Sequence, residues 1–161
     1  MVAWSSTRSG IAYGFFEGLD EVLRGGKYGF IDKTGRVVIE PQWEEVGVFS
    51  EGLARVERGG KYGFIDKTGR VISEPQWEDA SFPFKGLAYS VGYVKRGGKW
   101  GVIDKTGRVV IEPQWDFVQG YQEASNAPLY WYFARQEGNK VVVVWLDSKG
   151  DQIWSLDNQS H

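Results

Sequence analysis

The chain has 161 residues but no cysteine, one histidine and no apolar run of the roughly 18 residues that a membrane-spanning helix needs. The absence of cysteine excludes disulfides and thiolate metal sites. A single histidine, His161, cannot supply a histidine-rich metal site, and no histidine-based catalytic triad is expected. We therefore expect no metal, no cofactor and no membrane insertion.

Net charge is also small, because 19 basic and 21 acidic residues give a formal charge of -2 with the two signs interleaved. This balance lacks the basic footprint of a nucleic-acid-binding protein, so nucleic acid is not an expected partner. Met1 to Gly10 lacks the basic start and apolar stretch of a signal peptide. That favours a cytoplasmic protein, or an exported one whose leader is absent from this chain.

What the chain does contain is a tandem repeat of about 34 residues. The segment at Arg24 to Glu44 recurs almost verbatim at Arg58 to Glu78 and at Arg96 to Asp116, and four extra residues precede the third copy. A divergent fourth copy is expected near the end, in NKVVVVWLDSKGDQIW. We divide the single expected domain into an N-terminal cap (1–16), repeat 1 (17–50), repeat 2 (51–84), repeat 3 with an insertion (85–118), and repeat 4 with a C-terminal cap (119–161).

Each repeat carries signals of strands and turns. KYGFID and RVVIEP are short runs rich in branched and aromatic residues, with the turn DKTG between them and a Gly-Gly pair ahead of them. The pattern predicts three antiparallel strands in a meander, with Pro41, Pro75 and Pro113 ending the third strand. Gly29, Gly63 and Gly101 are expected to allow close approach of a neighbouring side chain, most readily an aromatic one. The fold class is therefore all-β, with meanders stacked as a superhelix or a propeller-like ring.

These motifs resemble the WG, or KWG, β-repeat family of bacterial proteins. GKYGFID occurs twice and GKWGVID once, each followed by KTGR, an apolar strand and EPQW. Tyr28 and Tyr62 stand where the family name expects tryptophan, and Trp100 keeps it. The resemblance covers roughly Glu17 to Trp154. It implies a β-repeat protein that is often part of a larger or exported one, and it implies no particular reaction.

The repeated carboxylates are the obvious candidates for acid and base chemistry, and we weigh them against a structural role. Asp32 and Glu40 recur in every copy, whereas an active site is normally assembled once from dissimilar residues. A turn aspartate is needed in each hairpin. We therefore expect no catalytic residue and no enzyme activity.

The aromatic residues form the sharpest binding hypothesis. Trp43, Trp77 and Trp115 recur once per repeat beside an acidic residue, where they predict either a stacking platform for ligands or a plug between consecutive repeats. Further candidates lie where the copies differ, since insertions often map to a binding face. These are Tyr89 and Tyr93 in the insertion, and Tyr121, Tyr130 and Trp131 after the third repeat. Capping of the ends of the stack is the competing explanation.

The sequence therefore predicts a scaffold for protein–protein recognition, with a few aromatic anchors and a polar rim. The alternative is a glycan- or cell-wall-binding module that stacks sugar rings on the repeated aromatic residues. A third hypothesis is an architectural or oligomerisation spacer, because an unpaired edge strand favours self-association.

Overall fold

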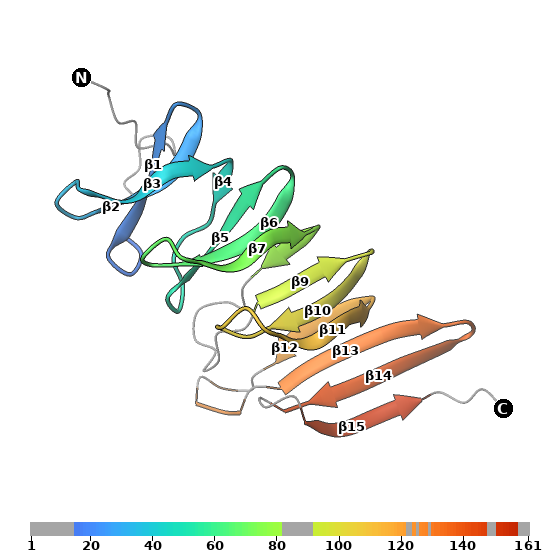
Figure 1. Cartoon of the computed structure of the whole chain (residues 1–161). Coiled ribbons are helices and arrows are strands. Elements are labelled where there is room, and N and C mark those ends of the chain that lie inside the picture. Colours follow the sequence, from blue (N-terminus) through green and yellow to red (C-terminus); the bar gives the residue numbers. More distant parts are fainter. Residues whose placement is uncertain are drawn as a thin grey trace. The chain divides into compact units, whose positions relative to one another are not determined.

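The computed structural model describes residues 15–81, 92–121, 124, 126–128, 130–147 and 151–157. Across these residues the regular structure is all β-strand, and no helix there could span a membrane. The strands form four open antiparallel sheets (Figure 1). The chain divides into two compact units, Met1–Trp77 and Glu78–His161, with two sheets in each. The prediction of an all-β fold of tandem antiparallel meanders is confirmed.

In both units the strands of a sheet follow one another in sequence order. The first unit contains β1 (Leu19–Arg24), β2 (Lys27–Asp32) and β3 (Val37–Trp43), then β4 (Glu45–Val46), β5 (Leu53–Arg58), β6 (Lys61–Asp66) and β7 (Val71–Trp77). The second unit contains β8 (Asp79–Ser81), β9 (Gly92–Arg96), β10 (Lys99–Ile103) and β11 (Val109–Trp115), then β12 (Phe117–Tyr121), β13 (Tyr130–Glu137), β14 (Lys140–Leu146) and β15 (Gln152–Asp157).

A short fourth strand, which the sequence did not predict, opens each sheet after the first. β4, β8 and β12 start two residues after the tryptophan that ends the previous third strand, and each pairs with the strand that follows it. The segment after each tryptophan is therefore more than a connection. Only one residue, Glu44, Glu78 or Asp116, separates consecutive sheets.

The local turn signals are confirmed. Gly25 and Gly26 both have positive φ, 59° and 74°, as a primed two-residue turn requires. In the DKTG turn Gly35 has a φ of 81°, and its amide donates to the Asp32 carbonyl at 2.9 Å. The backbone amide of Asp147 donates to the carbonyl of Asp151, as that of Asp32 donates to the carbonyl of Arg36.

The third strands continue past their prolines, so the prediction that Pro41, Pro75 and Pro113 end them is wrong. β3 runs two residues beyond Pro41 to Trp43 because its register with β2 shifts opposite Gly29. Tyr28 pairs with Trp43 and Phe30 with Ile39, so the extra residues bulge over the glycine. Proline is tolerated at such a bulge because its missing amide breaks no ladder bond.

The glycine opposite the bulge does allow a close approach, but what approaches is backbone rather than an aromatic side chain. A Cβ added to Gly29 would lie 2.3 Å from the carbonyl oxygen of Ile39 and 2.6 Å from the nitrogen of Pro41. The corresponding contacts at Gly63 are 2.4 Å to Ser73 and 2.7 Å to Pro75, and Gly101 repeats the arrangement.

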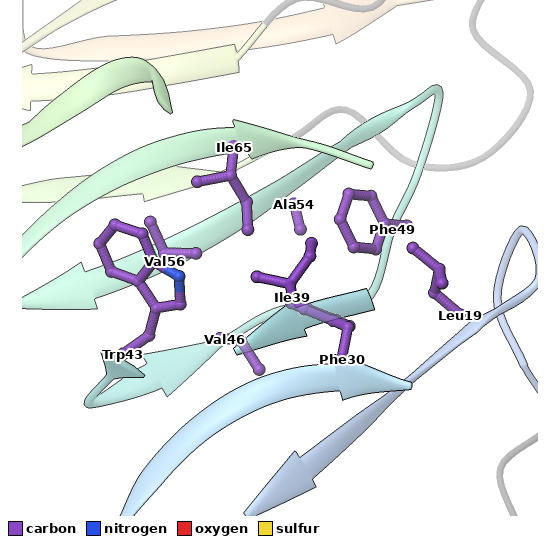
Figure 2. Close-up of a cluster of buried hydrophobic side chains, with 9 residues drawn as sticks. All are labelled: Leu19, Phe30, Ile39, Trp43, Val46, Phe49, Ala54, Val56 and Ile65. Carbon is purple, nitrogen blue, oxygen red and sulfur yellow. The ribbon is translucent and has the colours of Figure 1, made fainter. Parts of the chain in front are cut away.

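The core of the first unit lies between its two sheets. Figure 2 shows buried side chains of both sheets meeting there, with Phe49 from the loop after β4 packing edge-on against Phe30 at 4.7 Å between ring centroids. The full cluster consists of Leu19, Phe30, Ile39, Trp43, Val46, Phe49, Ala54, Val56 and Ile65. One face of the first sheet is thus buried by the sheet that follows it.

The bulge predicts a steep cost for a single methyl group at Gly63. Gly63→Ala should lower the free energy of unfolding by roughly 2–3 kcal/mol, because the new Cβ displaces the backbone at Ser73 and Pro75. Gly47→Ala is the matched control, since a Cβ there meets nothing closer than 3.7 Å and Gly47 does not need a positive φ. Urea denaturation of both variants checks this, and equal stabilities would contradict the close approach.

Candidate functional site

The tryptophan that ends each third strand is buried. Trp43, Trp77 and Trp115 expose only 1%, 1% and 7% of their surface. Trp43 packs between the first two sheets (Figure 2), and the Arg58 guanidinium lies 4.1 Å from its ring centroid. A platform for ligands needs an exposed ring face, so the predicted ligand-binding role of these three residues is wrong.

Trp115 plugs the junction of the second unit in the same way. It belongs to a cluster with Trp131, Phe133, Val144 and Leu146 of the following sheet. The centroids of the Trp115 and Phe133 rings are 5.4 Å apart, and Arg135 lies over the Trp115 ring at 4.8 Å. The alternative prediction, a plug between repeats, therefore describes Trp43 and Trp115.

The indole N–H groups differ between copies. Trp77 donates to the Ser73 hydroxyl at 2.9 Å. Ile39 stands in the place of Ser73 in the first repeat and Ile111 in the third, and within the described residues the N–H groups of Trp43 and Trp115 have no partner. In the first and third repeats an isoleucine at the position of Ser73 therefore adds apolar packing but leaves the indole N–H without a hydrogen-bond acceptor.

The acidic residue beside each tryptophan accepts hydrogen bonds from backbone amides of the hairpin that follows it. Glu78 accepts hydrogen bonds from the amides of Gly97 and Gly98, at 2.8 and 3.0 Å. Glu44 accepts the Gly59 amide at 3.1 Å in the same way. In the last junction Asp116 bonds Lys99 and the amide of Gln136, and these two bonds hold the pKa of Asp116 below its ordinary value of 3.8. These carboxylates act as structural ties.

The turn aspartates, weighed above as acid–base candidates, are committed to their own hairpins. Asp66 accepts hydrogen bonds from the Thr68 hydroxyl at 2.6 Å, the Thr68 amide at 2.8 Å and the Arg70 amide at 3.1 Å. Burial raises the pKa of Asp66, but these bonds together outweigh it and leave the pKa below 3.8. Asp32 and Asp104 repeat the pattern. The described residues contain no group of three or more acidic or histidine side chains placed to hold a metal.

The described part of the predicted recognition loop is a strand. Tyr93 lies in β9, where its ring packs against Trp131 at 5.3 Å. Burial raises the pKa of Tyr93 to about 12, so its hydroxyl remains protonated. Trp131 is itself a buried core residue. Trp131 therefore offers almost no surface to a ligand, whereas the ligand contact of the half-buried Tyr93 stays a prediction, and Tyr89 lies outside the described residues.

Tyr121 and Tyr130, the remaining candidates, lie on an unusual surface of the last sheet. The strand registers place one set of side chains on the face of this sheet opposite the Trp131 and Phe133 core. We call this surface the aromatic face. It consists of Phe117, Gln119, Tyr121, Tyr130, Tyr132, Ala134, Gln136, Val141, Val143, Trp145, Trp154 and Leu156.

The aromatic face is partly open to solvent and contains no charged residue. Tyr121 and Trp154 expose 47% and 50% of their surface. Trp145 packs edge-on against Tyr121 at 6.1 Å and against Tyr132 at 5.3 Å. An open groove of about 410 Å³ is lined by Tyr121, Tyr130, Trp145, Ile153 and Trp154.

Trp145 and Trp154, which the sequence reasoning left out, are the central residues of this surface. They pair with each other as Phe30 pairs with Ile39, and a one-residue bulge follows at the same place. The sequence signal for these two strands was the pair of apolar segments VVVVW and QIW on either side of DSKG, which resembles DKTG. It was missed because the fourth copy lacks the Tyr-Gly pair that marks the middle strand elsewhere.

A family model described as WG containing repeat matches residues 28–62, 62–100 and 100–139, which together make up more than half of the chain. Searches of curated proteins and of solved structures found no match.

The turn aspartates predict a defined loss of stability in acid. Because the pKa of Asp66 is lower in the folded protein than the ordinary 3.8, its contribution to stability is complete above pH 3.8 and is lost as the pH falls through the folded-state value. Asp66→Asn should flatten that part of the curve of unfolding free energy against pH. Carboxyl carbon shifts followed by NMR give the pKa directly, and a value at or above 3.8 would refute the account.

Proposed function

Because the chain belongs to the WG-repeat family, we propose that it is a non-enzymatic repeat scaffold that recognises another protein through the aromatic face. The observation that carries the proposal is the exposure of large aromatic side chains at positions that are buried in earlier sheets. Exposed apolar patches of this kind mark interaction sites on soluble proteins.

The comparison with the other sheets supports an interface rather than a cap. A capping repeat usually presents a polar outer surface, because it must keep the stack soluble. On the second sheet the equivalent positions hold charged residues, Glu45, Arg55 and Glu57. On the last sheet those positions hold Phe117, Tyr132 and Ala134. At these positions the last sheet is thus less polar than the second, which is the opposite of what capping requires.

The arrangement of the rings favours a protein surface as the partner. Tyr121 and Trp145 meet at an interplanar angle of 89°, and Tyr132 and Trp145 meet at 68°. Such rings present edges and faces together, which suits the irregular apolar surface of a protein. An extended sugar chain stacks best on rings that lie flat along one surface.

A glycan remains the second candidate, and the groove is the observation that favours it. Tyr121, Tyr130 and Trp154 line an open depression of about 410 Å³, a volume in the range of pockets that hold small ligands. The glycan hypothesis therefore moves from the repeated tryptophans, which are buried, to this groove.

The absence of enzyme activity is also part of the proposal. The repeated carboxylates are occupied in turns and junctions, as Asp66 and Glu78 illustrate. The groove is lined by tyrosine, tryptophan and isoleucine side chains, with no carboxylate, lysine or histidine among them.

Affinity capture with matched variants tests this function. We expect a protein partner that is retained by wild type and by Val110→Glu, and lost from Trp154→Glu, because both side chains are exposed but only Trp154 lies on the aromatic face. The same three proteins are applied to a glycan array. Partner capture that Trp154→Glu leaves intact would contradict the proposal, and array binding lost only in Trp154→Glu would favour the glycan alternative.

A further inference from the structure

The aromatic face is equivalent to the surface that this repeat elsewhere covers with another sheet. In the first unit Phe30 and Ile39 are 1% and 3% exposed because the second sheet packs on them (Figure 2). In the second unit Val102 has the position of Phe30 and is buried in the cluster shared with the last sheet. Trp145 and Trp154 occupy the same two positions on the last sheet. The expected complement of this surface is therefore the apolar face of a β-sheet.

The lack of charge on this surface permits it to pair with a copy of itself. When two identical surfaces pair about a twofold axis, a charged group near the axis approaches its own copy and is repelled by it. The aromatic face carries no charged side chain, so a second copy meets no such penalty.

We propose that the aromatic face pairs with the aromatic face of a second copy of this chain, sheet against sheet. The inference rests on the proposed function, because it names the partner of the same surface. The pairing continues the stacking of sheets that operates within each unit, and it buries Tyr121, Trp145 and Trp154 of both copies. A twofold contact of this kind uses one patch on both partners and closes after two chains.

The size of the sheet sets the strength of this contact. Four strands about 4.8 Å apart, each about six residues long at about 3.4 Å per residue, give a footprint of roughly 400 Å² per copy. Stable specific complexes bury about 800 Å² per partner. We therefore expect a reversible dimer whose population depends on protein concentration.

Sedimentation velocity of the purified full chain over a concentration series tests the pairing. For wild type the weight-average mass should rise from the 18.2 kDa of one chain towards twice that value. Tyr121→Glu and Trp154→Glu should stay at the monomer mass, because each places a charge in the paired surface. Val110→Glu is the control, since it adds the same charge at an exposed apolar residue of β11 and should associate like wild type. Circular dichroism confirms that all variants are folded.

The outcomes separate this inference from the proposed function. A wild-type monomer at every concentration overturns the pairing, while loss of a captured partner in Trp154→Glu would still uphold protein recognition by the face. Association that Tyr121→Glu and Trp154→Glu leave unchanged also overturns it, because another surface, such as the outer edge of β15, would then join the copies.

Discussion

Within each unit, burial of the tryptophan that ends the first sheet, Trp43 or Trp115, against the second sheet is the contact on which the described structure depends. Burying roughly 200 Å² of an indole stabilises the fold by at most about 5 kcal/mol, whereas a hydrogen bond to a charged group, such as that from the Gly59 amide to Glu44, contributes about 2 kcal/mol. The tryptophan is therefore the larger of these two contributions, and the acidic residue beside it holds the hairpin that follows. Gly29 makes this placement possible, since the bulge it permits carries β3 past Pro41 and brings Trp43 opposite Tyr28.

In each unit the second sheet covers an apolar face of the first. The last sheet has the same construction, with Trp145 and Trp154 where the first sheet has the buried Phe30 and Ile39, but these two rings remain accessible. The same physical requirement that stacks the repeats thus generates the surface to which we assign recognition.

The parts of the fold that were predictable from sequence are those encoded over a few residues. Asp32 and Gly35 specify their turn wherever the rest of the chain lies, and the alternation of KYGFID identifies a strand. The end of β3 was mispredicted because proline interrupts a β-ladder only where the neighbouring strand would accept a hydrogen bond from its backbone amide. Pro41 lies in the bulge opposite Gly29, where the pairing between β2 and β3 is interrupted in any case. The site was harder still. Trp43 and Trp154 are both strand tryptophans, but Trp43 is buried against the second sheet and Trp154 is half-exposed, a difference that depends on contacts between sheets rather than on the local sequence.

A double-mutant cycle between Trp115 and Phe133 tests the central contact most directly, since these rings come from consecutive sheets and lie 5.4 Å apart. Trp115→Phe and Phe133→Leu, alone and together, keep both positions apolar so that the variants still fold. The account predicts a coupling energy of about 0.5–1.5 kcal/mol in urea denaturation, the range measured for aromatic pairs in contact. Additive losses, with no coupling beyond error, would mean that Trp115 stabilises its own sheet alone and would contradict stacking through the tryptophan.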